Sequence, residues 1–371
     1  MNMNIAIISM TDESMGCIKR ISNDIQQILI IEKDYKKWNK NENGITICSL
    51  DKALKSYQMH EINYFLIPAL KRGNVFHSMY LPLHEEQIPD KAILYISYDI
   101  VYGSGLIDLR NLHPFIERNE LDRLELHIID KCNLKCANCS MFAALVDDES
   151  SIDFTQTKNG LLRLKKVYNR IHEIDIFGGE PLLSPLLLEY CELVRMIYPS
   201  SQIYIVTNGT RIPQLSDELL KKLKEFQIQF SITYYPSLDG VIEKAISNLN
   251  RYNIRFEVLP RRTFFLRLYN FYQNCTSEEV HRHCPRKSLI IAMREQYLAS
   301  CYVPFAFQYA AKKYNIPYSE EQLINLMDSK LCSSMINKKL LLPLTCCKYC
   351  HDDRTEWRQT NEYHLEDWSI L

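Results

Sequence analysis

The sequence predicts an α/β protein in which a small Rossmann-like domain precedes a (β/α) barrel and a cysteine-rich C-terminal domain. Short apolar runs alternate with polar, helix-like stretches along most of the chain, and polar residues follow many of these runs. Because the carboxyl ends of parallel strands meet at one face of a barrel, that pattern places functional groups together. The third observation is that the chain has 13 cysteines, several of them closely spaced.

The first of these domains is expected over residues 1–110. Its apolar runs are the length of buried strands in a parallel sheet, and they are Ile5–Ile8, Ile28–Ile31, Tyr64–Ile67 and Ile93–Ile96. The segment after the first run lacks the G-x-G-x-x-G that brings backbone close to a pyrophosphate. We therefore do not expect dinucleotide binding, and we interpret Glu32 as a solvated strand end.

A second set of alternating elements begins at residue 118 and continues to 270. The expected strands are Leu124–Ile128, Ile174–Phe177, Ile203–Val206, Ile228–Thr233 and Arg255–Val258. One helix is predicted from an apolar stripe of Leu161, Leu164, Val167, Tyr168 and Ile171. A second is expected to start at the N-cap Ser184 with Pro185 in its first turn, and a third to carry Val241, Ala245 and Leu249.

Three cysteines directly follow the first of these strands. Cys132, Cys136 and Cys139 are spaced C-x3-C-x2-C. Protein-bound 4Fe-4S clusters usually take four thiolates, so three would leave one iron open to an outside ligand. The alternatives are a zinc site that uses some of these thiolates with more distant partners, or a group of buried, unligated cysteines.

This cysteine loop is followed by Gly178-Gly179-Glu180-Pro181 and then by Thr207-Asn208-Gly209. The order and spacing of these motifs resemble those of the radical S-adenosylmethionine (SAM) superfamily. The resemblance implies a partial, open barrel over residues 118–270. It also implies a cluster whose open iron binds SAM and reductively cleaves it to a 5'-deoxyadenosyl radical. Asn138 stands where that family usually carries an apolar residue.

The resemblance further implies which residues contact SAM. Gly178, Gly179, Glu180 and Pro181 correspond to the segment that binds the ammonium of the methionine moiety. The polar residues at the ends of later strands, which would bond the carboxylate or ribose, are Thr207, Asn208 and Ser231. Taken without the cysteines, the first segment could be a tight turn with an outward Glu180, and Thr-Asn-Gly is also an ordinary turn. Tyr234, Tyr235, Glu257 and Arg262 are expected near the same strand ends, with no assignable catalytic role.

A second cysteine group lies in residues 271–371. Four of its thiolates could hold one metal centre, and they are Cys284, Cys301, Cys347 and Cys350, with Cys346 in reserve. The pattern resembles the twitch/SPASM-like auxiliary-cluster domain of radical SAM dehydrogenases. It therefore implies a second, auxiliary 4Fe-4S cluster, whereas a zinc site from the same residues is the alternative.

Composition limits the classes of partner. The net charge is −1 and 46% of residues are apolar, which fits a globular protein without the basic clusters of a nucleic-acid-binding protein. No apolar run approaches the roughly 18 residues of a membrane span, and no signal peptide is recognised. We therefore expect a cytoplasmic protein that acts on a small molecule without nucleic-acid or membrane partners and takes electrons from a donor such as flavodoxin or ferredoxin. The oligomeric state is left open.

The resulting functional prediction is a radical SAM oxidoreductase that dehydrogenates or rearranges a sugar, nucleotide sugar or cyclitol. The preference for such substrates comes only from resemblance to radical SAM proteins of polysaccharide-type gene clusters. Two alternatives remain. One is a peptide-modifying radical SAM enzyme, and the other is a non-catalytic zinc-binding protein.

Overall fold

The protein divides into two compact units, one formed by residues 1–122 with 332–338 and the other by residues 123–331 with 339–371. The structure, a computed structural model, describes residues 3–8, 11–21, 25–32, 34–42, 45–69, 80–147, 151–236, 238–260, 264–284, 291–319, 322–360 and 362–369. Among the helices in those ranges, none has the length and apolar character needed to cross a membrane.

The first unit is built on a seven-stranded sheet in the order β3-β4-β2-β1-β5-β6-β7. The inner strands β4, β2, β1, β5 and β6 are parallel, and this order reverses direction between β1 and β5, as in Rossmann-like sheets. All four predicted apolar runs are strands of this sheet. Its elements are β1 (Met3–Ile8), α1 (Asp12–Ile18), β2 (Ile25–Ile31), β3 (Asn41–Glu42), β4 (Ile45–Cys48), α2 (Leu50–Gln58), β5 (Tyr64–Pro68), α3 (Leu81–Glu85), β6 (Ile93–Ile96), α4 (Tyr98–Val101), β7 (His113–Pro114) and α11 (Ser333–Lys339).

The second unit contains an eight-stranded sheet in the order β12-β11-β10-β9-β8-β14-β15-β16. The strands from β12 to β8 are parallel, as is β14 beside β8, whereas β15 and β16 are antiparallel additions. The bounds are β8 (Glu120–Ile129), β9 (Arg170–Gly178), β10 (Gln202–Thr207), β11 (Ile228–Ile232), β12 (Phe256–Val258), β14 (Ile291–Arg294), β15 (Tyr297–Ala299) and β16 (Ile324–Asn325). The α/β class and the partial barrel are confirmed.

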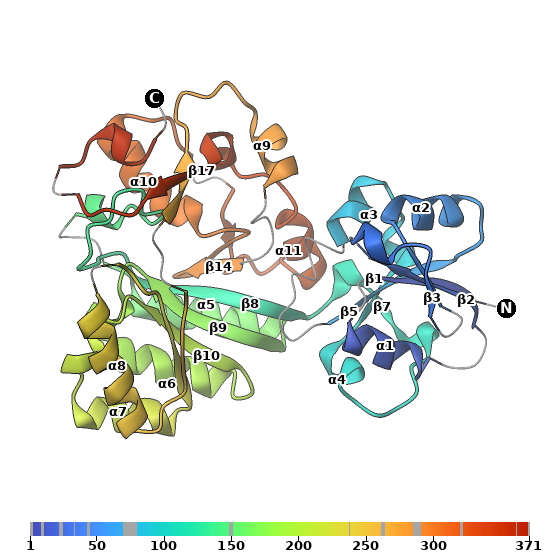
Figure 1. Ribbon diagram of the computed structural model, residues 1–371, viewed down its shortest axis with the longest axis horizontal. Coiled ribbons are helices and arrows are strands. Elements are labelled where there is room, and N and C mark those ends of the chain that lie inside the picture. The colour runs from blue at the N-terminus through green and yellow to red at the C-terminus, as the bar shows by residue number, and fades with distance from the viewer. Residues whose placement is uncertain are drawn as a thin grey trace. The chain divides into compact units, whose positions relative to one another are not determined.

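Helices connect successive parallel strands and cover one face of this sheet (Figure 1). They are α5 (Phe154–Val167), α6 (Leu187–Ile197), α7 (Asp217–Glu225) and α8 (Asp239–Arg251). Two predicted details are wrong. Helix α5 ends at Val167, so Ile171 belongs to β9. Ser184 is not the N-cap of α6, because residues 181–183 form a 3-10 turn and the helix starts only after Leu186.

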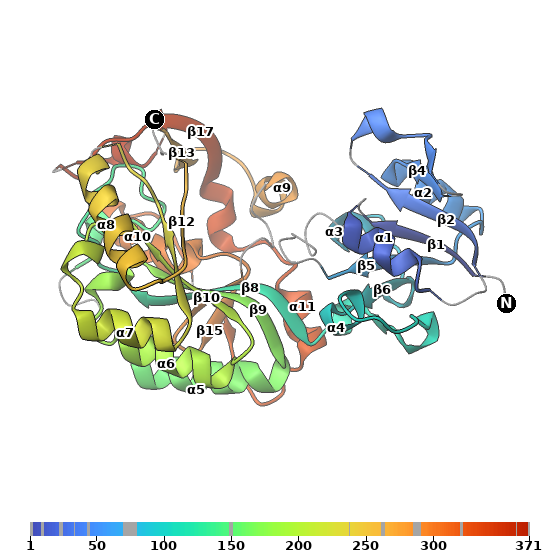
Figure 2. The same ribbon diagram turned by 60° about the horizontal axis from the view of Figure 1, so that its bottom comes forward.

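Most of the residues after 270 belong to the same unit as the barrel, namely 271–331 and 339–371. Strand β14 pairs with β8, so the boundary we expected at residue 270 falls inside one compact unit. Strands β13 (Phe264–Tyr269) and β17 (Cys350–Glu356) form a separate antiparallel pair (Figure 2). Helices α9 (Ser277–His283) and α10 (Val303–Tyr314) complete this region.

Candidate active site

The cysteine loop follows the carboxyl end of β8, as the sequence predicts. Cys132 and Cys139 are partly buried and Cys136 is 5% exposed. All three thiols line one cavity of about 410 Å³ at the carboxyl ends of β9, β10 and β11. Within the described residues, no three His, Cys, Asp or Glu side chains are gathered so that they could hold a single metal ion. The three cysteines instead share the lining of one cavity.

N–H groups surround the three thiols. The Leu134 amide lies 3.4 Å from Cys132 Sγ, and the Trp357 indole Nε1 lies 3.3 Å from Cys136 Sγ. Amides of the residues after Cys139 donate to that thiol. Hydrogen bonds to sulfur are a normal feature of thiolates that hold an iron-sulfur cluster. The donor set therefore fits a 4Fe-4S cluster.

Burial raises the pKa of each of these thiols. The pKa of Cys136 is raised to about 12 by burial and by the neighbouring Cys139, while Trp357 acts in the opposite direction. Burial is also the main reason that the pKa values of Cys132 and Cys139 are raised. Thiols in such an environment lose their protons when a cationic metal centre compensates the charge. This chemistry agrees with the predicted role of the triad.

The glycine pair allows the end of β9 to approach the end of β8 closely. Gly178 has a φ of 147°, and a Cβ placed on it would lie 2.0 Å from the Ile129 carbonyl oxygen. A Cβ on Gly179 would lie 2.2 Å from the Lys131 carbonyl oxygen. The Gly179 amide in turn donates to Ile129 O at 2.8 Å. Gly178 and Gly179 line the cavity, and they also allow the end of β9 to pack against the start of the cysteine loop.

Glu180 is fully buried and is not among the residues that line the cavity. Its carboxylate accepts hydrogen bonds from the Thr207 hydroxyl at 2.7 Å, the Asn208 amide at 2.9 Å and the Leu182 amide at 3.0 Å. Burial raises its pKa, and these bonds offset part of that rise. Glu180 thus joins the turns after β9 and β10. Pro181, which begins the following 3-10 turn, is also buried and away from the cavity lining.

The remaining predicted SAM contacts do line the cavity. They are Thr207, Asn208 and Ser231. The Asn208 side-chain amide donates to Asn133 Oδ1 at 3.0 Å and lies 3.8 Å from Cys132 Sγ. It therefore joins the end of β10 to the cysteine loop. The structure brings these residues and the cysteine triad to one place, while their contacts with SAM stay predictions.

Carboxylates dominate the polar groups deeper in the barrel. Glu125 lines the cavity and is 5% exposed. Arg123 donates from Nε to Asp175 at 2.7 Å and lies 3.2 Å from a Glu173 oxygen. Burial raises the pKa of Asp175 to about 6, although Arg123 lowers it. The cavity therefore meets a barrel interior in which acidic groups outnumber basic ones.

The other expected cavity groups have separate positions. Tyr235 lines the cavity, and Glu257 accepts a 2.9 Å hydrogen bond from the Ser231 hydroxyl. The Tyr234 hydroxyl donates to Asp239. Arg262 lies outside the described residues. Sequence reasoning missed Trp357 and Glu125, because the proximity of Trp357 to the cysteine loop is a tertiary contact and Glu125 has the appearance of an ordinary strand residue.

Asn138 has a conformational reason to be asparagine. Its φ is 58°, in the left-handed region that asparagine tolerates better than bulky apolar residues. The residue is 4% exposed, and its amide donates to the Asp367 carbonyl oxygen at 2.6 Å. The departure from the apolar pattern therefore coincides with a left-handed turn in the cysteine loop.

The second cysteine group gathers around a shared aromatic core. Cys346 is 1% exposed and interacts electrostatically with Cys350, Cys347 and Cys301. Cys347 interacts in the same way with Cys284. Burial raises the pKa of Cys347 to about 11. These interactions link the five cysteines in pairs, although no three of them in the described residues are gathered so that they could hold a single metal ion. The auxiliary cluster and its ligands remain a prediction.

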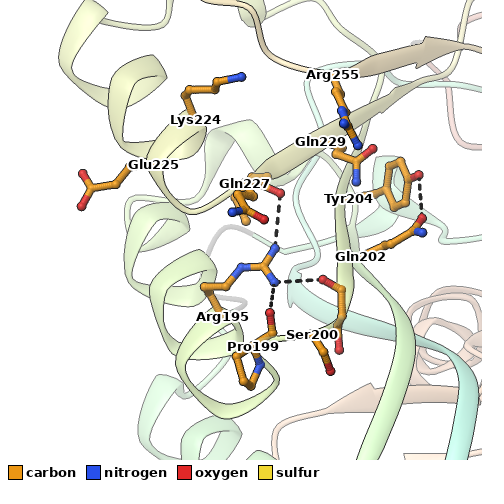
Figure 3. Close-up of a pocket in the computed structure, with 12 residues that line it drawn as sticks. Arg195, Pro199, Ser200, Gln202, Tyr204, Lys224, Glu225, Gln227, Gln229 and Arg255 are labelled. Carbon is orange, nitrogen blue, oxygen red and sulfur yellow. Dashed lines mark hydrogen bonds between the residues drawn. The ribbon is translucent and has the colours of Figure 1, made fainter. Parts of the chain in front are cut away.

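A larger cavity of about 860 Å³ lies at the opposite, amino-terminal ends of the strands (Figure 3). Its central cation, Arg195, donates to the carbonyl oxygens of Pro199 and Ser201 at 2.8 and 2.9 Å and to that of Phe226 at 2.8 Å. Lys224 likewise donates to the Asn253 carbonyl. These contacts satisfy carbonyl oxygens that follow the ends of α6, α7 and α8, so we assign the cavity a structural role.

Comparison with known proteins agrees with the geometry. Residues 126–260 match the Radical SAM superfamily model. This part of the chain is therefore similar to a radical SAM domain. The match begins within β8 and ends just after β12, so it covers the cysteine loop and the strand ends that line the cavity. A radical SAM domain implies a 4Fe-4S cluster and SAM.

Curated relatives of the radical SAM domain match over part of their length. GTP 3',8-cyclase of Clostridium perfringens (strain SM101 / Type A) is 29% identical over 159 residues, which cover 38% of this chain and 47% of the relative. GTP 3',8-cyclase of Trichodesmium erythraeum (strain IMS101) is 28% identical over 105 residues, 28% of this chain and 32% of the relative. The chain thus spans less than half the length of these relatives.

Solved structures with a similar arrangement are more distant. BtrN in complex with AdoMet and 2-DOIA is 17% identical, with a TM-score of 0.39 over 62% of this chain and 92% of BtrN. Native anSMEcpe with bound AdoMet is 16% identical, with a TM-score of 0.31 over 52% of this chain and 49% of that protein. TM-scores this low support no conclusion about function.

Proposed function

We propose that this protein is a radical SAM oxidoreductase that dehydrogenates or rearranges a small polyhydroxylated substrate such as a sugar or cyclitol. One observation carries the proposal. The three cysteine thiols share a cavity of about 410 Å³ with polar strand ends and with Glu125. A cluster and SAM at the thiols would supply a 5'-deoxyadenosyl radical, and the side chains of the barrel would hold the substrate beside it.

The charge of the barrel favours a substrate without phosphate groups. Among the residues described as lining the cavity, Arg123 is the one arginine or lysine, and Asp175 and Glu173 already engage it. A triphosphate is usually bound by several cations or by backbone amides at a glycine-rich loop. Glu125 and the Ser231–Glu257 pair are instead suited to accept hydrogen bonds from hydroxyl or amino groups.

For dehydrogenation, the substrate must lose two electrons and two protons. The radical would take one C–H hydrogen atom, and a proton and one electron would leave from the resulting substrate radical. The second cysteine group is the proposed acceptor of that electron, through an auxiliary 4Fe-4S cluster held by Cys284, Cys301, Cys347 and Cys350. An electron donor such as flavodoxin or ferredoxin would supply the electron that cleaves SAM.

A second candidate function is a reaction on GTP. It is favoured by the sequence relatives named GTP 3',8-cyclase, although they match less than half of their length. The excess of carboxylates in the described part of the barrel argues against this reaction. GTP therefore belongs in the same substrate panel as neutral polyols, aminated polyols, nucleotide sugars and short peptides.

The test combines metal analysis with turnover. Iron, acid-labile sulfide and zinc are measured after anaerobic reconstitution in the wild type and in a Cys132→Ala/Cys136→Ala/Cys139→Ala variant, and dithionite-driven 5'-deoxyadenosine is measured alongside. We expect about 8 iron atoms to fall to about 4, with loss of 5'-deoxyadenosine. About 4 iron atoms in the wild type would exclude the auxiliary cluster as electron acceptor. Zinc without turnover would overturn the enzymatic proposal. Selective consumption of GTP would favour the second candidate.

A further inference from the structure

A C-terminal segment is hydrogen-bonded along the cysteine loop. We call its described residues, 357–360 and 362–369, the strap. Four of its contacts involve the loop backbone: Ala137 N to Arg358 O at 3.0 Å, Thr360 N to Lys135 O at 2.7 Å, Asn138 N to Asp367 O at 2.6 Å, and Trp368 Nε1 to Cys139 O at 3.2 Å. These bonds hold the loop to a part of the chain that is more than 200 residues away in sequence.

One strap residue reaches a cluster thiol directly. The indole Nε1 of Trp357 lies 3.3 Å from Cys136 Sγ. Its ring also stacks on Tyr235, with centroids 5.6 Å apart and planes 27° apart. Because Tyr235 lines the cavity, Trp357 contacts both a ligand of the expected cluster and the cavity wall.

The residues on either side of Trp357 in the chain hold it in this position. Strand β17 ends at Glu356, immediately before Trp357, and its pairing with β13 positions that end. The bond from Ala137 to Arg358 fixes the residue that follows Trp357. The indole is therefore held on both sides along the chain, so its N–H is oriented toward the sulfur before any cluster binds.

An N–H group that points at a cluster thiolate changes the energy of cluster reduction. Reduction adds negative charge to the cluster and its sulfurs, and a hydrogen bond to sulfur stabilises the more negative state. We propose that Trp357 is a positioning residue that raises the reduction potential of the radical cluster and thereby favours electron transfer into it. This inference rests on the cluster that the proposed function requires at Cys132, Cys136 and Cys139.

The test is an EPR-monitored reductive titration of the reconstituted, full-length protein. Trp357→Phe removes the N–H and keeps an aromatic ring for Tyr235. We expect the equilibrium constant for reduction of the radical cluster to fall several-fold, and a tenfold fall would correspond to about 59 mV for one electron. A Cys→Ala background that removes the second cysteine group keeps the signal to one cluster.

Two control variants separate the N–H from other effects. Trp368→Phe removes an indole that donates to a backbone carbonyl of the same loop rather than to sulfur. Tyr235→Leu removes the stacking partner and leaves the Trp357 N–H in place. We expect both controls to titrate like the wild type, with iron content measured first in every sample.

The outcomes are distinct. Trp357→Phe with full iron and an unchanged midpoint would overturn this inference while leaving the proposed function intact. A wild type without a reducible cluster would instead overturn the proposed function. If Trp357→Phe fails to load iron, pulsed EPR of the reduced wild type labelled with 15N-tryptophan decides the question. Hyperfine coupling to one indole nitrogen supports the contact, and its absence contradicts it.

Discussion

The hydroxyl of Tyr302 lies 3.0 Å from Oγ of Ser140, and this contact joins the residue after Cys301 to the residue after Cys139. Tyr302 also lines the active-site cavity. Cys132 and Cys139 pack against the aromatic core that contains Tyr302, and Cys301 and Cys350 pack against the same core. The two cysteine groups are therefore linked by a short path of covalent bonds and one hydrogen bond.

Tyr302→Phe should weaken any electron transfer between the two groups. Loss of the hydroxyl breaks the bond to Ser140 while the ring keeps most of its packing. If the second group accepts an electron from the substrate, we expect more 5'-deoxyadenosine to be released per product in this variant. The measurement is the ratio of 5'-deoxyadenosine to product under dithionite.

The matched control for that variant is Tyr309→Phe in helix α10, which Tyr302 precedes as the N-cap residue. The Tyr309 hydroxyl contacts Asp130 at 2.7 Å and is not part of the path between the cysteine groups. We expect its ratio to equal that of the wild type. If Tyr302→Phe and Tyr309→Phe both gave the wild-type ratio, the Tyr302 hydroxyl would be excluded from the electron route.

Glu180→Ala should lower stability as well as SAM binding. The substitution leaves the buried Thr207 hydroxyl and Asn208 amide without their acceptor, and each such loss costs about 1–3 kcal/mol. We expect a lower melting temperature, with a smaller decrease for Glu180→Gln, which retains one oxygen. A weaker affinity for SAM with unchanged melting would instead support the ligand contact that the resemblance implies.

The fold was predictable where apolar runs were long and bounded by polar residues. Strands β1, β5, β9 and β10 were placed by such runs within a few residues. Helix starts were harder to predict from the sequence. Helix α6 begins only after the 3-10 turn that starts at Pro181, so Ser184 is an ordinary turn residue. The pairing of β14 with β8 joins residues far apart in sequence, and local patterns contain no information about it.

The site was predictable where chemistry is encoded by spacing. The cysteine triad, Thr207, Asn208 and Ser231 line one cavity, as their positions after strands suggested. The direction of the Glu180 side chain could not be predicted from the sequence, since a carboxylate after a glycine pair can contact either a ligand or other residues of the protein. Trp357 was missed for a different reason, because only the folded strap brings it to Cys136.

The two adjacent cysteines of the second group should differ in their effects. Cys347 has the two-residue spacing to Cys350, and it is more exposed than Cys346, which is 1% exposed within the aromatic core. We expect Cys347→Ser to lose about 4 iron atoms and Cys346→Ser to retain them with a lower melting temperature. Iron analysis of both variants checks this, and the reverse pattern would make Cys346 the ligand.

His127→Phe should reduce the sensitivity of the protein to acid. His127 is fully buried among Phe177, Tyr302 and Phe305, and neither ring nitrogen has a hydrogen-bond partner among the described residues. Burial lowers its pKa to about 3, although Asp130 opposes this shift and Arg294 adds to it.

The sign of this pH effect follows from the unfolded state. There, the imidazole has a pKa of about 6.5 and binds a proton at pH values at which the buried imidazole of the folded protein stays neutral. Wild-type stability is therefore lost as pH falls from about 6.5 towards 3. The loss from this group is about 2 kcal/mol by pH 5. Urea unfolding of both proteins between pH 5 and 8 checks it, and other groups such as Asp175 cancel in the difference. We expect His127→Phe to gain stability relative to the wild type as pH falls, and a constant difference across this range would show that His127 is not held neutral by burial.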